Sequence, residues 1–373
     1  MSSIVVSDDV PVVGAVYCEY RHSNWGLTVE DWQDCVDLVA LQAWMDRQGL
    51  GRGNITPPRA LGGGTQNVVL KFERDGLTYV LRRPPVTPRA GSNYTMRREM
   101  RMLTALANTT VPHPGLIASC PEEDVLGVAF YLMEPVEGFT PTTGLPDLHA
   151  SDPGLRRRMG LALIDGITAL GAVDHNAVGL GDFGNPDNYL DRQVARWRRQ
   201  LQSYDELAGW PGPAAIPGVE KIARWLDAHK PGSFQPGIIH GDYHLGNVMY
   251  RYDGPELAAI VDWELTTIGD PLLDLGWVLA TWPGDGEMPV QALSVTPWEG
   301  FPSAGELVAH YRVGTDRNLE AIDWYAVLAC YKLGIILEGT YARACAGHAP
   351  MAAGKMLHQS TVQLFERALR WIR

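Results

Sequence analysis

The fold is decided by the segment Ile239-His240-Gly241-Asp242-Tyr243-His244-Leu245-Gly246-Asn247-Val248-Met249. A second acid, Asp262, follows fifteen residues after Asn247, next to the apolar run Leu257–Val261. Polar residues after a buried strand are ordinary turn residues, but a turn does not require a further acid at the end of another strand. The joint spacing of Asp242, Asn247 and Asp262 therefore indicates a functional site.

Two further patterns bear on the chemistry. His240, Asp242 and His244 alternate, and alternating imidazole and carboxylate groups also suit a metallohydrolase. That alternative leaves a Gly-rich stretch unexplained, Leu61-Gly62-Gly63-Gly64-Thr65-Gln66-Asn67, which precedes two apolar runs joined by a turn at Asp75-Gly76. A Gly-rich turn lets backbone N–H groups approach phosphate groups. It lacks the G-K-[ST] ending of a P-loop, so that class of nucleotide-binding protein is disfavoured.

Together these motifs resemble those of the aminoglycoside phosphotransferase and choline kinase branch of the protein-kinase-like fold. The five-residue spacing from Asp242 to Asn247 equals that of the H-R-D-x-x-x-x-N loop of protein kinases. The resemblance implies an enzyme, a kinase that uses ATP and Mg²⁺ to phosphorylate a hydroxyl of a small molecule. It implies that Asp242 orients the hydroxyl and accepts its proton, while Asn247 and Asp262 hold Mg²⁺ on the phosphates. His240 is expected to brace the loop, and His244 to organise it.

The resemblance also implies where a nucleotide binds. In the Gly-rich loop it assigns phosphate contacts to Gly63, Gly64, Thr65, Gln66 and Asn67. Arg82 stands where the family usually has a phosphate-contacting Lys, with Glu99 as its expected ion-pair partner and Arg83 as the fallback. This is a departure from the family, because arginine keeps the charge but replaces a point charge by a planar fork.

The expected fold class is α+β, a protein-kinase-like bilobal fold with a small β-rich N-lobe and a larger, mostly helical C-lobe. The expected parts are an N-terminal arm and leading helix over 1–54, an N-lobe over 55–133, a hinge over 134–138 and a C-lobe over 139–373. The hinge is expected to hydrogen-bond adenine through backbone groups near Glu134 and Val136. The chemistry is expected where the two lobes meet.

Apolar periodicity predicts a leading helix within 28–48. Its expected buried face is Val29, Trp32, Val36, Val39 and Ala43. Further helices are predicted at 96–107, 154–172, 187–207, 218–229, 304–313, 323–346 and 355–372. Strands are predicted at 68–72, 78–82, 128–133, 237–240 and 257–261. Asp270 and Asp274 match a family segment beneath the catalytic loop, where structural hydrogen bonding is expected.

Two segments, 179–200 and 323–339, bear on the identity of the phosphate acceptor. They resemble the kinase domains fused to acyl-CoA dehydrogenases. This resemblance implies a hydroxyacyl-CoA as the acceptor. The helical spacing of Arg192, Arg196 and Arg199 gives a basic stripe that suits an anionic ligand, although a solvated charged face is the open alternative. Two other functions stay open: an aminoglycoside or other antibiotic phosphotransferase, and a nucleotide-binding pseudokinase, which Arg82 favours.

Composition limits the partners and the compartment. The 373 residues include 31 Lys and Arg against 43 Asp and Glu, a formal charge of -12, so a nucleic-acid partner is disfavoured. The five cysteines are widely spaced without a C-x-x-C pair, which fits a reducing compartment. The start of the chain lacks a basic segment typical of signal peptides, and no apolar run reaches the length of a membrane helix. We therefore expect a cytoplasmic protein without membrane partners, of unspecified oligomeric state.

Overall fold

The computed structural model describes residues 31–34, 36–61, 67–85, 87–88, 90–284, 290 and 293–372. The chain divides into two compact units. The first comprises the residues up to Arg101 together with Gly115–Pro135, and the second comprises Met102–Pro114 together with Val136–Arg373. The chain therefore passes from one unit to the other three times.

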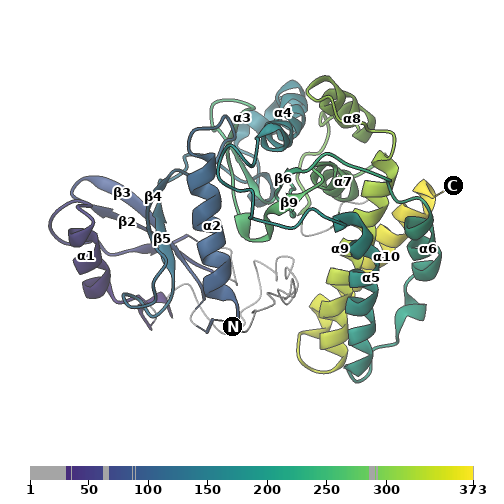
Figure 1. The fold of residues 1–373 in the computed structure, drawn as a ribbon, viewed down its shortest axis with the longest axis horizontal. Helices are drawn as coiled ribbons and strands as arrows, with labels where there is room; N and C mark the ends of the chain where they lie inside the picture. The colour runs from purple at the N-terminus through teal and green to yellow at the C-terminus, as the bar shows by residue number, and fades with distance from the viewer. Residues whose placement is uncertain are drawn as a thin grey trace, which may run out of the picture. The chain divides into compact units, whose positions relative to one another are not determined.

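The first unit is built on a five-stranded antiparallel sheet with the strand order β1-β2-β3-β5-β4 (Figure 1). Its strands are β1 (Arg59–Ala60), β2 (Val68–Arg74), β3 (Leu77–Arg83), β4 (Leu116–Cys120) and β5 (Phe130–Met133). The β2–β3 hairpin turns at Asp75 and Gly76, which both have the positive φ that a tight two-residue hairpin turn requires. The three strands predicted in this region are confirmed.

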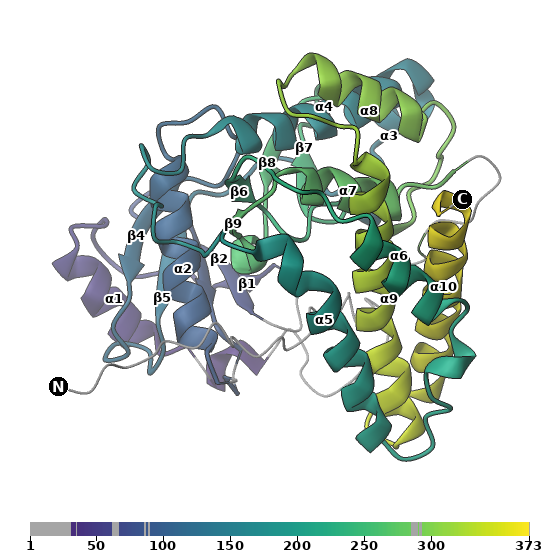
Figure 2. The ribbon, with the colours of Figure 1, turned by 45° about the vertical axis from the view of Figure 1, so that its right-hand side comes forward.

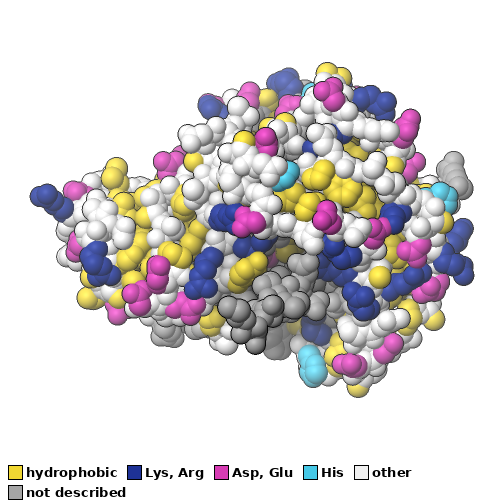
Figure 3. Space-filling view, viewed as in Figure 1, with side chains coloured by type: hydrophobic (Ala, Val, Ile, Leu, Met, Phe, Trp, Pro, Cys, Tyr) yellow, Lys and Arg dark blue, Asp and Glu magenta, His cyan; other side chains and the backbone are white. Residues whose placement is uncertain are grey.

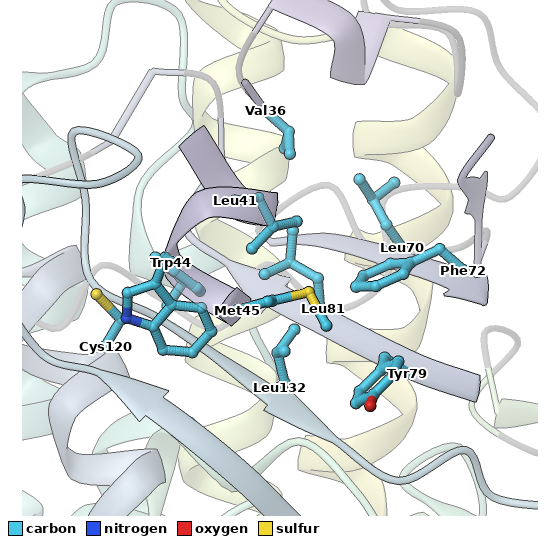
Figure 4. Packing of buried hydrophobic residues seen from close by; sticks show 11 residues of the cluster. Val36, Leu41, Trp44, Met45, Leu70, Phe72, Tyr79, Leu81, Cys120 and Leu132 are labelled. Carbon is cyan, nitrogen blue, oxygen red and sulfur yellow. The ribbon is translucent and has the colours of Figure 1, made fainter. Parts of the chain in front are cut away.

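Helix α1 (Leu38–Arg47) packs through a face other than the predicted one. The core of this unit contains Val36, Leu41, Trp44, Met45, Leu70, Phe72, Tyr79, Leu81, Cys120, Phe130 and Leu132 (Figure 4). Val39, by contrast, is 80% exposed. The helix begins only at Leu38, because the Asp37 carboxylate caps it by accepting hydrogen bonds from the next backbone N–H groups. Of the predicted face, Val36 lies in this core and Trp32 packs against it, whereas Val39 and Ala43 are exposed and Val29 lies outside the described residues. The prediction therefore holds before the cap, and its phase is wrong within α1.

The second unit is mostly helical. After α2 (Ser92–Leu106), which spans the boundary between the units, its helices are α3 (Asp147–Ser151), α4 (Pro153–Ala172), α5 (Tyr189–Gln202), α6 (Val219–Ala228), α7 (Leu272–Thr281), α8 (Ala304–Val313), α9 (Ile322–Cys345) and α10 (Met351–Trp371). Helix α9 packs against α5, α6, α7 and α10, and two views show α5 and α10 beside it (Figures 1 and 2). Short 3-10 turns complete the described chain at Asp31–Asp34, Pro141–Thr143, Ser203–Glu206, Pro213–Ala215 and Trp263–Leu265.

The predicted helices are confirmed, most with shifted ends, but the short α3 and the longer α7 were missed. The helix predicted at 187–207 ends at Gln202 and continues as a 3-10 turn. The residues of α7 are almost all buried, so the sequence lacks the polar face that produces a helical repeat. Within the described residues, none of the helices combines the length and the hydropathy needed to cross a bilayer.

Two small antiparallel sheets in the second unit carry the segment quoted above. Strand β6 (Gly237–Ile239) pairs with β9 (Thr267–Gly269), and β7 (Val248–Tyr250) pairs with β8 (Leu257–Ile260). Residues 240–247 therefore form a loop between β6 and β7, which we call the 240–247 loop. Both strands predicted in this region are confirmed.

Candidate active site

Backbone hydrogen bonds bring Asn247 and Asp262 to neighbouring positions. At the end of the β7–β8 hairpin, the Val261 N–H donates to the Asn247 carbonyl oxygen at 2.9 Å. The His240 ring nitrogen Nε2 lies 3.0 Å from the Val261 carbonyl oxygen. Both ends of the 240–247 loop are thus tied to the residue that precedes Asp262.

The Asp242 side chain is oriented by Asn247. The Asn247 amide nitrogen Nδ2 donates to the Asp242 carboxylate oxygen Oδ2 at 3.0 Å and to the Asp242 carbonyl oxygen at 2.9 Å. Because an amide nitrogen has two hydrogens, both are used by these bonds. The amide oxygen Oδ1 is then the atom of Asn247 that a metal ion could contact. The structure thus brings together Asp242 and Asn247, as the spacing predicted.

The two histidines organise the loop through backbone groups. The Asp242 N–H donates to His240 Nδ1 at 3.3 Å, which places the His240 proton on Nε2, facing Val261. The Gly246 N–H donates to His244 Nδ1 at 2.9 Å, and His244 Nε2 lies 3.5 Å from the Asp242 carboxylate. The metallohydrolase alternative is disfavoured, because both ring nitrogens of His240 already have backbone partners, at Asp242 and Val261.

Asp242 stays ionised in this environment. Burial by itself would raise the pKa of the Asp242 carboxyl, but the interaction with His244, followed by the charge of Lys332, lowers this pKa well below its usual range. An ionised carboxylate is the form that accepts a hydrogen bond from a hydroxyl. Asp242 can therefore orient an alcohol across the physiological pH range.

Asp262 lies in left-handed backbone, with φ 69° and ψ 63°. Apart from glycine, only Asn and Asp adopt this conformation with any regularity, so the position suits an acid. Magnesium prefers oxygen ligands and is usually bound by one or two carboxylates together with substrate phosphates. An amide oxygen from Asn247 and a carboxylate from Asp262 fit that donor set. The described residues contain no cluster of three or more His, Cys, Asp or Glu side chains arranged for a metal ion.

Asp274 and Asp270 lie beneath the loop and make structural hydrogen bonds. The Asp274 carboxylate accepts from the backbone N–H groups of His240 at 2.7 Å and of Gly241 at 2.9 Å. The Asp270 carboxylate accepts from the Tyr325 hydroxyl and, at 3.1 Å, from a backbone N–H at the start of α7. Burial raises the pKa of both carboxyl groups. The structural role expected for these two acids is confirmed.

In the first unit, Arg82 on β3 pairs with Glu99 on α2. The Arg82 Nε donates to Glu99 Oε2 at 2.8 Å, and the side chains are 12% and 1% exposed. Tyr131 donates its hydroxyl to the same carboxylate oxygen at 2.8 Å. The fallback residue, Arg83, is buried and donates to the Pro84 carbonyl oxygen. The ion pair inferred from the resemblance is thus present, with Tyr131 as a third member.

The other proposed nucleotide contacts are described only in part. Gly63, Gly64, Thr65 and Gln66 lie outside the described residues, whereas Asn67 precedes β2 and is partly buried. The Glu134 N–H donates to the Gly115 carbonyl oxygen at 2.8 Å. At Glu134, the backbone group that could contact adenine is therefore the carbonyl oxygen. Val136 is partly buried and begins the last segment of the second unit.

The three arginines of α5 have different surroundings. Arg192 donates to the carbonyl oxygens of residues 187 and 185, at 2.5 and 3.0 Å, and so holds its own preceding loop. Arg196 is partly buried and its charge lowers the pKa of Lys332, whereas Arg199 is exposed. Figure 3 shows Lys and Arg side chains on the face of the second unit where α5 lies. Arg196 is thus the member of the stripe whose charge reaches the surroundings of Asp242.

Sequence reasoning missed Lys332 and Tyr131 as members of these groups. Lys332 donates to the Gly241 carbonyl oxygen from α9, 91 residues away in sequence. Tyr131 reaches Glu99 from an apolar strand whose residues read simply as core. Lys332 lies within the segment 323–339 quoted above, but no spacing in the sequence assigned it a contact, and Tyr131 has no spaced polar partner either.

A family comparison agrees with this geometry. Residues 58–301 match the model described as the phosphotransferase enzyme family. Because the match covers well over half of the chain, the chain belongs to this family. The expected membership of the aminoglycoside phosphotransferase-like family is confirmed.

Curated relatives carry acyl-CoA dehydrogenase names. Acyl-CoA dehydrogenase family member 10 of Mus musculus is 28% identical over 78% of this chain and 27% of its own length. Family member 11 of Gallus gallus is 29% identical over 83% of this chain and 40% of its own length. The chain thus spans between about a quarter and two fifths of these relatives, and the expected similarity to domains within such proteins is confirmed.

Solved structures share the fold. A protein from Ralstonia eutropha JMP134, described as a "putative aminoglycoside phosphotransferase", is 30% identical with a TM-score of 0.72, and the match covers 90% of this chain and 98% of that one. The GDP complex of an aminoglycoside 2'-phosphotransferase of type IIIa is 15% identical with a TM-score of 0.59 over 90% of this chain and 98% of that one. The expected α+β, bilobal kinase-like fold class is therefore confirmed.

Proposed function

We propose that this chain transfers the γ-phosphoryl group of ATP, in the presence of Mg²⁺, to a hydroxyl of a small molecule, and that the acceptor is a hydroxyacyl-CoA. The observation that carries the proposal is the Asp242 carboxylate, oriented by the Asn247 amide next to the backbone that leads into Asp262. Membership of the phosphotransferase family supports the reaction class.

Support for a nucleotide comes from the first unit and from related folds. The partly buried Arg82, paired with the buried Glu99, supplies a fixed guanidinium of the kind that contacts phosphate groups. A thermostable mutant of the aminoglycoside phosphotransferase APH(4)-Ia, of the same fold at 13% identity and a TM-score of 0.53, was solved with ADP and hygromycin B. We assign Asn67, Arg82, Glu134 and Val136 to nucleotide binding on this basis, together with the Gly63–Gln66 loop.

The proposed reaction forms a bond between the acceptor oxygen and the γ-phosphorus, while the bond from that phosphorus to the β,γ-bridging oxygen breaks and ADP leaves. The hydroxyl proton passes to the Asp242 carboxylate. Because the pKa of Asp242 is lowered, this carboxylate is a weak base that mainly orients the hydroxyl. When bound to Asn247 and Asp262, Mg²⁺ would neutralise charge on the phosphates.

The charges near Asp242 support an acyl-CoA acceptor. The positive charges of Lys332 and Arg196 favour an acceptor that carries anionic groups, as CoA does, over a polycation. The names of the curated relatives point to the same class of ligand.

The test is a direct assay of phosphoryl transfer from ATP with Mg²⁺ to hydroxyacyl-CoAs, simple alcohols and aminoglycosides. We expect stoichiometric ADP and a phosphorylated acyl-CoA. Transfer to aminoglycosides alone would favour the antibiotic-modifying alternative, which the description of the Ralstonia protein suggests. Tight ATP binding without transfer to any acceptor would instead favour the pseudokinase, which Arg82 in place of lysine suggests.

Replacement of Arg196 tests the sign of the acceptor's charge. We expect Arg196→Gln to raise the KM for the acyl-CoA about tenfold, the effect of losing one charge-assisted hydrogen bond, without changing the KM for ATP. Arg224→Gln, at an exposed arginine of α6, is the matched control. We prefer Arg196 to Arg192, because Arg192 also holds the loop before α5. An unchanged acceptor KM in Arg196→Gln would mean that the basic stripe is only a solvated face.

A further inference from the structure

Lys332 on α9 occupies a fixed place beside the 240–247 loop. Its ammonium nitrogen Nζ donates to the Gly241 carbonyl oxygen at 3.0 Å. The same atom lies 4.3 Å from the ring centroid of Trp277 and 5.7 Å from that of Trp197. A cation over an indole face is attracted by the ring quadrupole, most strongly where water is excluded. Lys332 is therefore held in place by one hydrogen bond and two aromatic rings.

The hydrogen bond from Lys332 acts on the peptide plane that leads into Asp242. The Gly241 carbonyl and the Asp242 N–H belong to one planar peptide group. The Asp242 N–H donates to His240 Nδ1, and the Gly241 carbonyl accepts from Lys332. On the other side of Gly241, its own N–H donates to Asp274. The Gly241 N–H, the Gly241 carbonyl and the Asp242 N–H thus all have partners.

We call the hydrogen bond from Lys332 to the Gly241 carbonyl the clamp. It is important because residue 241 is a glycine. Gly241 has a φ of +84°, and a Cβ there would lie 2.7 Å from the Leu265 carbonyl oxygen. Glycine is needed for this turn, but it also has the widest conformational freedom of any residue. The orientation of the plane that follows it must therefore come from outside partners, and Lys332 is the partner of its carbonyl.

A charge at residue 332 is not needed for packing. The pKa of Lys332 is lowered to about 8: burial is the main cause, the Asp242 and Asp274 carboxylates partly oppose it, and the Arg196 charge acts in the same direction as burial. An apolar side chain of similar length would fill the space between the two rings without desolvating an ammonium. The charge therefore points to a role in the site.

We propose that Lys332 is a positioning residue for phosphoryl transfer, whose ammonium fixes the Gly241–Asp242 peptide plane so that the carboxylate meets the acceptor hydroxyl. The proposal rests on the proposed function, because it needs Asp242 to contact the acceptor. It assigns to α9 a part in the reaction that the catalytic motif does not contain.

The kinetic test compares Lys332→Met, which keeps the length of the side chain, with Lys332→Arg, which keeps its charge. We expect Lys332→Met to lower kcat about 100-fold, as misplacement of a reacting group does, with the KM for ATP unchanged. Lys332→Arg should recover at least a tenth of the kcat. Lys355→Met, at an exposed lysine of α10, should match the wild type. A kcat of Lys332→Met within threefold of the wild type would overturn the proposal.

A second measurement works without an acceptor. Amide hydrogen exchange in the 240–247 loop should be at least tenfold faster in Lys332→Met than in the wild type, and near the wild-type rate in Lys332→Arg. Equal exchange in all three proteins would overturn the proposal even if the true acceptor is another compound. Conversely, a wild type that transfers phosphate to nothing, but shows this exchange pattern, would contradict the proposed function and leave the clamp intact.

Discussion

Asp242→Asn is expected to lower kcat about 100-fold or more, the cost of losing the carboxylate that positions the acceptor hydroxyl, and to leave the KM for ATP unchanged. Asparagine has the shape of aspartate, and Asn247 can still donate to the backbone carbonyl of residue 242, so the loop should keep its form. What is lost is the negative oxygen that orients the hydroxyl. Steady-state kinetics with a saturating acceptor measure this loss.

The pH dependence of that loss is a further check on the same variant. Because the pKa of Asp242 is lowered, the wild-type carboxylate stays ionised far below neutral pH. The ratio of wild-type to Asp242→Asn rates should therefore be constant between about pH 5.5 and about pH 6.5, a window above the pKa of about 4 of an ordinary aspartate carboxyl and below the pKa of Lys332. Asp253→Asn, at an exposed acid paired with Arg251, is the control. If Asp242→Asn turned over as fast as the wild type, Asp242 would have no catalytic role.

The geometry of the 240–247 loop could be predicted from the sequence because its contacts are local. Asp242 and Asn247 are five residues apart and touch directly, and one short hairpin brings residue 261 to Asn247. These contacts depend on spacing that can be counted along the chain. The roles of the three residues remain predictions, because their placement is shown and their chemistry is not.

Contacts between distant segments could not be predicted in this way. Lys332 meets Gly241 only because α9 packs against α5 and α7, which the sequence does not specify. Helix α7 gave no periodic signal because it is buried on nearly all sides. The position of α1 depended on one capping residue, Asp37, which set where the helical repeat begins. Tertiary packing and helix caps thus determine long-range contacts, fully buried helices and helix ends, which periodicity alone does not predict.

The departure at Arg82 has a physical interpretation in the structure. A lysine would offer Glu99 one compact ammonium, whereas arginine presents Nε and Nη2 to the two carboxylate oxygens, at 2.8 and 3.4 Å. Tyr131 holds the oxygen that accepts from Nε, so the fork has a fixed direction. The pair keeps the charge arrangement of a kinase site with different geometry, which is why we propose an active enzyme over a pseudokinase.

Asp262→Asn is expected to raise the Mg²⁺ concentration needed for half-maximal activity at least tenfold, because it removes the one carboxylate of the proposed metal site while keeping an oxygen ligand. Asparagine is the appropriate replacement for a structural reason. Asp262 has a φ of 69°, a conformation that asparagine tolerates, whereas alanine would add a backbone cost of about 1–2 kcal/mol. A loss seen in Asp262→Ala alone would therefore mix strain with lost metal binding.

The matched control is Asp75→Asn, which removes a carboxylate at another left-handed position, in the β2–β3 turn. Both variants change one acid to its amide at positive φ, so general effects of charge and backbone cancel in the comparison. Titration of activity with Mg²⁺ at saturating ATP should distinguish the two variants. The Mg²⁺ requirement of Asp75→Asn should equal that of the wild type. If Asp262→Asn showed the wild-type Mg²⁺ requirement, Asp262 would not be a metal ligand. The Asn247 amide alone, without an acid beside it, would bind Mg²⁺ on the phosphates too weakly. The proposed phosphotransferase mechanism would then have to place its metal elsewhere.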